Sequence, residues 1–250
     1  MATVAVEVVY RGIFQKNLAK EICRGIVFAA KKEGRIGTAF GRYGDSPERN
    51  GIPAKQYAVG SDNGEELEAS LSKYEPTEVD VTIALDDTLC KGIESWAWYG
   101  FQPVNKLLKG NGTLIVTSQQ PSEDLIRDIH RKDAPYNLAI LRGQPSFSGM
   151  WVYKDDHTDV RVLGALANAC PQLFSLASVE QTVKEQWKSD IKVASAGKAY
   201  ERLVTRRVEP GEGNPGKTYS YELLNWQDME EGVVVRAMKV GGGFRGGDKG

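Results

Sequence analysis

The chain has 250 residues, of which 41% are apolar and 26% are charged, a composition typical of a globular protein with a core large enough to fold alone. Its formal net charge of -1 gives no electrostatic reason to expect binding to nucleic acid or to an anionic membrane surface. No apolar run is long enough to span a bilayer, and residues 1–12 lack the basic region and cleavage site of a signal peptide, so we expect a cytoplasmic protein.

The first half of the chain alternates strands with a long helix. The β-branched segment VAVEVVY at residues 4–10 predicts a strand buried on both faces. Apolar residues at helical spacing predict a helix over residues 17–32, which begins with Asn17 as its N-cap and ends at Gly34 in the left-handed conformation. Further strands are expected over residues 35–40, 54–59 and 79–85.

The second half of the chain continues this alternation. Strands are expected over residues 113–117 and 137–141. Gly164 should let the helix around it pack closely against a neighbour. The expected helices are residues 102–109, 123–131, 158–170, and a segment from a capping box at Ser178 to Trp187. Strands and helices in this order predict an α/β fold, a Rossmann-like layered domain with a mainly parallel sheet.

The cysteines and histidines indicate no metal site. Cys23, Cys90 and Cys170 are widely spaced and form no CxxC pair, so we expect reduced, mostly buried thiols and no zinc or iron–sulfur ligands. His130 and His157 lie among charged residues, which is typical of solvated side chains. We therefore predict neither a metal site nor a catalytic triad made by this chain alone.

The segment RGIFQK at residues 11–16 follows the first strand, where many α/β proteins bind the pyrophosphate of a nucleotide. It has one glycine, Gly12, and the isoleucine and phenylalanine that follow would block the close backbone approach of a pyrophosphate. A dinucleotide is therefore disfavoured. Arg11, Gln15 and Lys16 could still contact a phosphate or a partner's carboxylate. The alternative is that the two apolar residues pack against a neighbouring subunit.

The segment GTAFGRYGDSPERNGIP at residues 37–53 combines glycines, arginines and a tyrosine, and it is unlike a plain solvent loop. Arg49 could pair with a carboxylate or an anionic cofactor. The alternative is an internal salt bridge from Arg49 to Glu48 or Asp45. We expect a binding or interface segment.

Two further groups follow the strand expected over residues 79–85. Asp86 and Asp87 lie at its carboxyl end, where α/β proteins gather ligands and partners. Trp96 and Trp98 belong to the aromatic stretch ESWAWYGF, which indicates an interface or a core plug. No basic residues interleave these aromatics, so a platform for stacking nucleic-acid bases is disfavoured.

The composition changes near residue 197. Residues 198–250 are rich in glycine and show little periodicity, so we expect a domain over residues 1–197 followed by an extended arm over residues 198–250. Tyr221 and Trp226 lie in an apolar cluster within this arm. The cluster favours an arm that docks on a partner subunit and becomes ordered there. The alternative is a flexible terminus.

Several of these segments, taken in order, resemble the gamma subunit, or gamma domain, of 2-oxoacid:ferredoxin oxidoreductases of the pyruvate synthase group. Residues 11–16 occupy the place of that family's GRGGQG-like loop but keep only Gly12 and Gln15. The resemblance covers roughly residues 4–190, and its ordered blocks are more specific than any single loop. The blocks are residues 33–40, Tyr43 with Gly44, residues 47–53, 74–76, 79–89 and 163–185, with residues 221–235 in the tail.

The resemblance implies an accessory subunit of a multi-subunit enzyme, with no activity of its own. Such an enzyme oxidatively decarboxylates a 2-oxoacid, with pyruvate as the first candidate. Coenzyme A is the co-substrate, acyl-CoA and CO2 are formed, and ferredoxin is reduced; the reverse direction fixes carbon. Thiamine diphosphate, Mg2+ and 4Fe-4S clusters would belong to the alpha, beta and ferredoxin-like delta-type partner chains, with ferredoxin as the electron partner.

The resemblance and the loop composition together predict which residues meet these partners. The residues expected to bind a cofactor or face the active site are Arg11, Gly12, Gln15, Tyr43, Arg49, Asn50 and Gly51. The residues expected at an interface are Trp96, Trp98, Tyr221 and Trp226. No residue of this chain is expected to be catalytic.

Two other functions stay open at this point. The chain could be a scaffold or assembly protein that contacts no ligand. It could also be a free-standing Rossmann-like enzyme that uses a nucleotide, which would need a phosphate loop and an acid–base set that the sequence does not supply convincingly.

Overall fold

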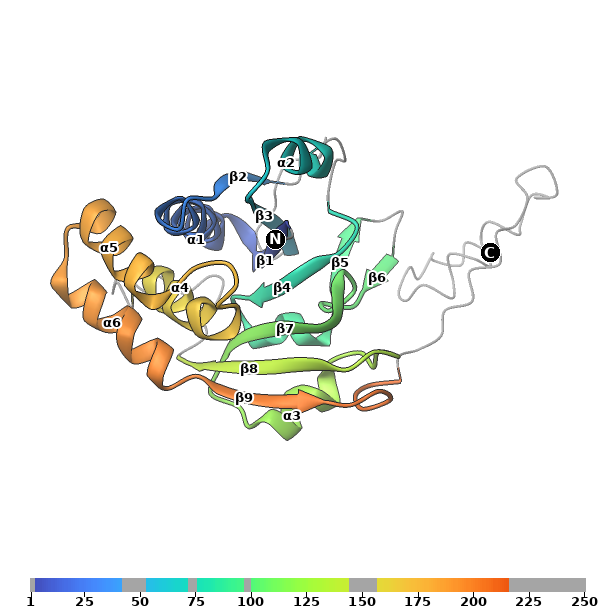
Figure 1. Ribbon diagram of the computed structural model, residues 1–250. Coiled ribbons are helices and arrows are strands. Elements are labelled where there is room, and N and C mark those ends of the chain that lie inside the picture. Colours follow the sequence, from blue (N-terminus) through green and yellow to red (C-terminus); the bar gives the residue numbers. More distant parts are fainter. Residues whose placement is uncertain (1–2, 42–52, 72–75, 97–99, 144–156, 216–250) are drawn as a thin grey trace, which may run out of the picture. The chain divides into compact units, whose positions relative to one another are not determined.

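A seven-stranded sheet runs through the described part of the chain, and four parallel strands form its middle (Figure 1). The computed structural model describes residues 3–41, 53–71, 76–96, 100–143 and 157–215. The parallel strands are β1 (Val4–Arg11), β4 (Val79–Ala84), β7 (Leu108–Ser118) and β8 (Tyr136–Arg142). Their continuous apolar sequences suit strands that are covered on both faces.

Antiparallel strands complete the sheet at both edges. At one edge, β3 (Pro53–Ser61) pairs with β1, and β2 (Ile36–Gly41) pairs with β3. At the other edge, β9 (Val204–Val208) pairs with β8. The order is therefore β2-β3-β1-β4-β7-β8-β9. This arrangement confirms the predicted α/β class with a parallel sheet at its core.

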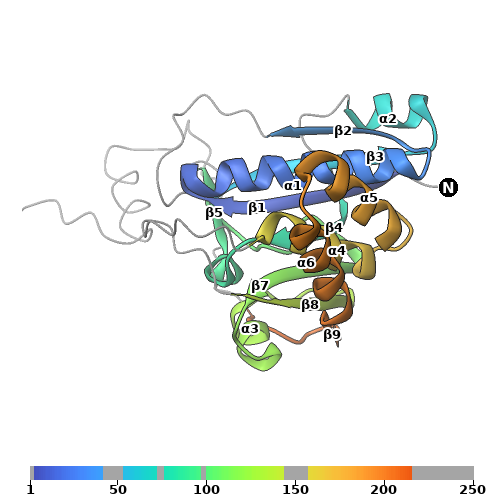
Figure 2. The ribbon, with the colours of Figure 1, turned by 90° about the vertical axis from the view of Figure 1, so that its left-hand side faces the viewer.

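Helices cover both faces of the sheet. The helices on one face are α1 (Gly12–Lys32), α4 (Thr158–Ala169), α5 (Leu176–Trp187) and α6 (Asp190–Glu201). The elements on the other face are α2 (Gly64–Leu71), the 3-10 helix η1 (Asp87–Lys91) and α3 (Ser122–Asp128). Figure 2 shows α1 running back along β1. A separate two-stranded hairpin joins β5 (Ile93–Trp96) to β6 (Gly100–Gln102).

Close packing of α4 against α6 confirms the expectation for Gly164. A Cβ atom at Gly164 would lie 2.1 Å from the carbonyl oxygen of Ala196, which is far inside van der Waals contact. Leu163 and Leu166 beside it are fully buried in the core below α1. The two helices therefore approach as closely as they do only because residue 164 has no side chain.

Two predicted helix starts are wrong. The helix expected from Asn17 begins at Gly12, directly after β1, and its N-cap residue is Arg11. The helix expected from Ser178 begins at Leu176, because the Ser175 hydroxyl accepts a hydrogen bond from the Ser178 amide and caps the helix. In contrast, Gly34 has a φ of 79° at the end of α1, as predicted.

The helix predicted over residues 102–109 is wrong as well. These residues end β6, form a turn and begin β7. The turn carries a bond from the Lys106 amide to the Pro103 carbonyl and one from the Leu108 amide to the Asn105 carbonyl. The buried Asn105 side chain also donates to the His130 carbonyl at 2.8 Å, which holds the turn against a distant loop. Tertiary contacts therefore override the local helical pattern.

The glycines at 110 and 112, which follow the helix expected over residues 102–109, lie inside β7. Asn111 between them has a φ of 62°, and the β4–β7 register shifts between Val79 and Val81. A Cβ atom at Gly112 would lie 2.8 Å from the Asp80 carbonyl oxygen. The glycines therefore permit a bulge in a long strand.

The boundary expected at residue 197 differs from the structure. Helix α6 continues through Gly197 to Glu201, and β9 then joins the main sheet. The compact unit extends to Gly216, and a second unit comprises Lys217–Gly250. The sequence pattern predicted neither α6 nor β9, and β9 depends on pairing with β8 and not on its own pattern.

Candidate functional site at the carboxyl edge of the parallel strands

The junction between β1 and α1 has no separate loop. β1 ends at Arg11 and α1 begins at Gly12, which has a φ of 67° and so has a conformation that glycine adopts without strain. The Arg11 amide donates to the Oε1 atom of the buried Gln15 at 2.7 Å. This side-chain bond closes the first turn of the helix. No backbone loop remains here to wrap around a pyrophosphate.

The carboxyl end of β4 is tied to β1 and then turns into η1. The Leu85 amide donates to the Val9 carbonyl at 3.1 Å. Asp86 caps η1, because its Oδ1 atom accepts from the Thr88 amide at 2.7 Å. The short capped turn sets the position of the next residue, Asp87, above the sheet edge.

Asp87 joins the ends of β4 and β7. Its Oδ2 atom accepts a hydrogen bond from the Ser118 hydroxyl at 2.7 Å and one from the Gln120 side-chain amide at 3.2 Å. The Gln120 backbone amide donates in turn to the Ser118 Oγ atom at 2.9 Å. Asp87 and Ser118 are both buried. The carboxylate is thus held by two donors, which stabilise its charge in a buried place.

Arg142 extends this polar edge to β8. Its Nη1 atom donates to the carbonyl oxygens of Gln119 and Gln120, at 2.6 Å and 3.0 Å. The ends of β1, β4, β7 and β8 therefore form one row of polar groups, which we call the carboxyl rim: Arg11, Gly12, Gln15, Asp86, Asp87, Ser118, Gln120 and Arg142. The bonds within the rim fix its shape and engage the Asp87 carboxylate, so the rim suits recognition better than acid–base chemistry.

The cysteines are buried, as expected. Burial raises the pKa of Cys170 to about 12, and it raises the pKa of Cys23 and Cys90 further. Thiols in this state are poor nucleophiles and poor metal ligands. Within the described ranges, no group of three or more His, Cys, Asp or Glu side chains could hold a metal ion.

His157 differs from the solvated side chain that we expected. It is half-buried, and its Nδ1 atom lies 2.9 Å from the Ser195 Oγ atom. The Ser195 hydroxyl also lies 2.9 Å from the Ile191 carbonyl oxygen and donates to it. A serine that donates to a helix carbonyl is not activated by the histidine. The pair therefore links α4 to α6.

The structure brings some of the predicted site residues together. Arg11, Gly12 and Gln15 lie at the β1–α1 junction, and Trp96 ends β5 opposite Gly100. The other predicted site and interface residues lie outside the described residues: Tyr43, Arg49, Asn50, Gly51, Trp98, Tyr221 and Trp226.

The sequence reasoning missed three rim residues: Ser118, Gln120 and Arg142. Each follows a predicted strand closely, as Asp86 and Asp87 do. The carboxyl ends of parallel strands meet at one edge of a sheet. Polar residues after every predicted parallel strand were therefore a usable signal.

Comparison with known proteins shows which solved structures share this fold. No known family model matches the sequence. The structure matches pyruvate oxidoreductase subunit PORC of Thermotoga maritima with a TM-score of 0.54 and 17% sequence identity, over 82% of this chain and 99% of that chain. The chain has the PORC fold. The resemblance drawn from the sequence is therefore confirmed at the level of the fold.

Two other solved structures are similar to this chain. The gamma subunit of a keto/oxoacid ferredoxin oxidoreductase from Geobacter sulfurreducens matches with a TM-score of 0.49 and 17% identity, over 80% of this chain and 94% of that chain. A 2-oxoglutarate:ferredoxin oxidoreductase from Magnetococcus marinus matches with a TM-score of 0.42 and 10% identity, over 80% of this chain and 30% of that chain. Within the described residues of this chain, no helix is both long and apolar enough to cross a membrane.

Proposed function

We propose that this chain is an accessory, gamma-type subunit of a 2-oxoacid:ferredoxin oxidoreductase. The observation that carries the proposal is the match to PORC over nearly the whole length of that subunit, joined to ordered sequence blocks that resemble the same family. The complex converts a 2-oxoacid and coenzyme A to acyl-CoA and CO2 and reduces ferredoxin. Pyruvate is the first candidate, and the reverse, carbon-fixing direction uses the same subunits.

In this proposal the cofactors belong to partner chains. The three thiols are buried and have raised pKa values, so they do not suit the ligation of an iron–sulfur cluster. The described residues also offer no acidic or histidine cluster for a divalent metal. Thiamine diphosphate, Mg2+ and the clusters are therefore assigned to alpha, beta and delta-type subunits, and this chain acts alongside them in the cytoplasm.

The role proposed for this chain is to shape the surface that meets those subunits. The carboxyl rim is held rigid by its own hydrogen bonds, and the Arg11–Gln15 contact orders its first part. Tyr43 and the segment Arg49–Gly51 are proposed to face the active site near thiamine diphosphate or coenzyme A. The missing loop between β1 and α1 weighs against the free-standing nucleotide enzyme.

Reconstitution tests the proposal. The chain would be purified with its native partner subunits, and reduction of ferredoxin would be measured with coenzyme A and a panel of 2-oxoacids. We expect activity with the complete complex, led by pyruvate, and none with this chain alone. A stable complex that turns over no 2-oxoacid would favour a scaffold, and an active lone chain would contradict the proposal.

A further inference from the structure

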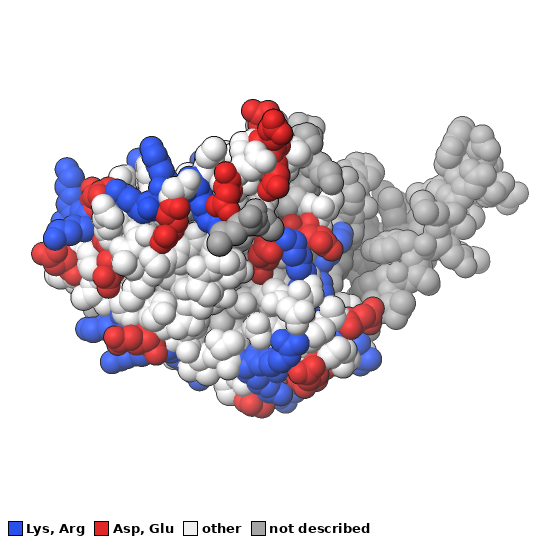
Figure 3. Space-filling model, in the orientation of Figure 1, with Lys and Arg blue, Asp and Glu red and all other residues white. Residues whose placement is uncertain are grey.

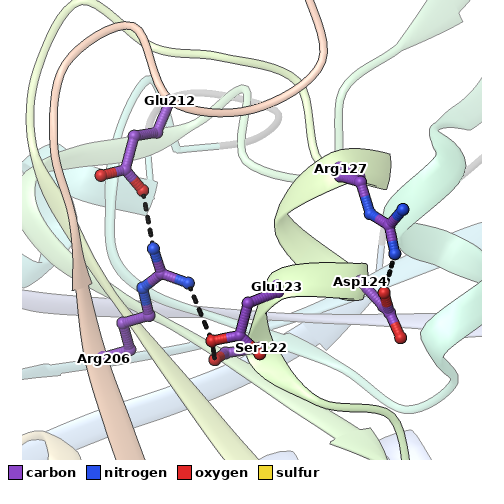
Figure 4. Close-up of polar contacts among 6 residues, drawn as sticks. All are labelled: Ser122, Glu123, Asp124, Arg127, Arg206 and Glu212. Carbon is purple, nitrogen blue, oxygen red and sulfur yellow. Dashed lines mark hydrogen bonds and ion pairs between the residues drawn. The ribbon is translucent and has the colours of Figure 1, made fainter.

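The two outer strands among the described residues differ in how they present their free edges. β9 has the sequence VTRRV. Arg206 forms ion pairs with Glu123 and Glu212, and Figure 4 shows this group beside the Arg127–Asp124 pair of α3. Charges of this kind commonly keep an edge strand from pairing with another chain. β2 has the sequence IGTAFG, without any charged residue.

A groove lies between β2 and α1. Gly37, Ala39 and Gly41 alternate along β2 and face α1, since Ala39 pairs with Ala58 of the core below that helix. A Cβ atom at Gly37 would already lie 3.4 Å from the Val27 Cγ1 atom. These small residues leave a groove of about 510 Å3, lined also by Lys20, Cys23, Arg24 and Phe28.

The groove therefore has an apolar floor and basic side chains along its mouth. Val27 and Phe28 are half-buried, and Lys20 and Arg24 are exposed. The Arg24 guanidinium lies 5.4 Å from the centroid of the Phe28 ring, and its ion pair with Glu21 is long, at 3.9 Å. A side chain that enters the groove would meet apolar surface below and positive charge above.

The opposite face of β2 has the opposite charge. Ile36 on that face lies beside α2, within 3.9 Å of where a Cβ atom at Gly64 would be, and it is 51% exposed. Helix α2 carries Glu65, Glu66 and Glu68, all exposed. Figure 3 shows acidic side chains gathered over α2 and basic side chains over the region of α1.

This charge pattern disfavours a second copy of the chain as the occupant. Pairing β2 with β2 of another copy about a two-fold axis normal to the sheet would bring α1 beside α1 and α2 beside α2. Like charges would then meet on both faces of the joined sheet, which opposes association. A different chain with the complementary pattern meets no such repulsion.

We propose that β2 accepts an extended, acidic segment of a partner protein as an added strand. The added strand would pair with the edge of β2 that no other described strand occupies, as in β-strand addition. Because side chains alternate along a strand, one face of the segment would place carboxylates and a large apolar side chain towards α1. Its other face would place neutral or basic side chains towards α2. The pattern does not depend on which enzyme the chain serves.

A binding experiment with two peptides of identical composition tests the proposal. In the probe, one face alternates glutamate with isoleucine and the other alternates threonine with lysine. In the control peptide, every glutamate and lysine are exchanged, so that isoleucine shares its face with lysine. We expect the full chain to bind the probe about tenfold more tightly than the control at low salt. We also expect the probe to slow amide hydrogen exchange in residues 36–41.

Two matched variants locate the site. Arg24→Glu reverses a charge at the mouth of the groove and should weaken probe binding about tenfold. Arg127→Glu, at another exposed arginine that also has an acidic partner three residues before it, should leave binding unchanged. If Arg24→Glu lowers the melting temperature, Lys20→Glu provides a second variant at the mouth of the groove.

Equal affinity for the two peptides, no binding of either, or equal effects of the two arginine variants would overturn the proposal. Binding without slower exchange at residues 36–41 would overturn the strand addition. A chain that dimerises in sedimentation, with protection of the same residues rising with concentration, would show that a second copy is the occupant instead.

Discussion

The Oε1 atom of Glu33 lies 2.6 Å from the Ser178 hydroxyl, and the two residues are 145 positions apart in the chain. The same oxygen accepts from the Ser175 hydroxyl at 2.7 Å and from the Ser175 amide at 2.9 Å. A carboxylate at the end of α1 therefore caps the first turn of α5. A negative charge at the N-terminus of a helix is favourable, so this contact joins the two helices beside the sheet.

Replacing this carboxylate should destabilise the fold. We expect Glu33→Ala to lower the free energy of unfolding by about 1 kcal/mol, because three hydrogen bonds at a helix start are lost. The melting temperature should fall by about 3 °C. Glu21→Ala is the control, since among the described residues the Glu21 carboxylate makes only a long contact, 3.9 Å from Arg24. Equal melting temperatures for the two variants would contradict the capping role.

The stability that Glu33 contributes should depend on pH. Hydrogen bonds from Ser178 and then Ser175 lower the pKa of Glu33 below its ordinary value of 4.5. A folded-state pKa below the unfolded value means that the contribution is complete above the unfolded pKa and is lost as pH falls through the folded pKa. The difference in urea midpoint between wild type and Glu33→Ala should be constant from neutral pH to about pH 5. It should shrink at lower pH, and a constant difference down to about pH 2 would contradict this assignment.

A buried ion pair and a hydrogen bond to the same carboxylate join three strands of the sheet. Glu7 of β1 lies 3.0 Å from the Lys55 ammonium of β3 and accepts from the Thr82 hydroxyl of β4 at 2.7 Å, and all three are buried. We expect Glu7→Gln to cost about 3 kcal/mol or more, because Lys55 is left buried without an anion. The measurement is urea unfolding.

The double variant Glu7→Leu with Lys55→Met provides the control for this pair. It removes both charges and should recover most of the lost stability, since a well-packed apolar pair can replace a buried ion pair. If the double variant is less stable than Glu7→Gln, the stability lost in Glu7→Gln comes from loss of the ion pair itself and not from the unpaired lysine.

The close packing of α4 against α6 can be tested by comparing alanine substitutions at two glycines. Gly164→Ala should lower the free energy of unfolding by about 2 kcal/mol or more, because its Cβ would meet the backbone of Ala196. Gly197→Ala, in α6, meets only ordinary contact, at 3.6 Å from a Glu180 oxygen. It should raise stability by about 0.5 kcal/mol. Similar effects of the two substitutions in thermal unfolding would contradict the close packing.

A kinetic prediction follows from the proposed function. Arg49→Ala, in the reconstituted complex, should lower turnover or weaken the apparent affinity for coenzyme A, because an arginine is suited to an anionic group of a cofactor or substrate. Arg127→Ala is the control, since Arg127 is an exposed residue of α3 paired with Asp124. An intact complex with unchanged kinetics for Arg49→Ala would refute an active-site-facing role.

Some features of this protein were determined by the sequence alone. The β-branched run at residues 4–10 predicted β1, because a strand covered on both faces needs no polar side. Gly34 predicted the end of α1, and Gly164 predicted close helix packing, because in both places only the missing side chain mattered. In the candidate site, the sequence placed Arg11, Gly12 and Gln15 directly after the first strand, where they lie in the structure.

Other features were decided only by the tertiary structure, because they depend on partners distant in the chain. A turn at residues 103–107 takes the place of the expected helix, because the Asn105 side chain donates a hydrogen bond to the His130 carbonyl. β9 lies in a region that is rich in glycine, and it is a strand because it pairs with the edge of β8. In the rim, Asp87 meets Ser118 across 31 positions, a contact that exists because β4 and β7 are parallel neighbours. Local pattern thus predicted the elements whose stability is local, and strand pairing and side-chain contacts decided the rest.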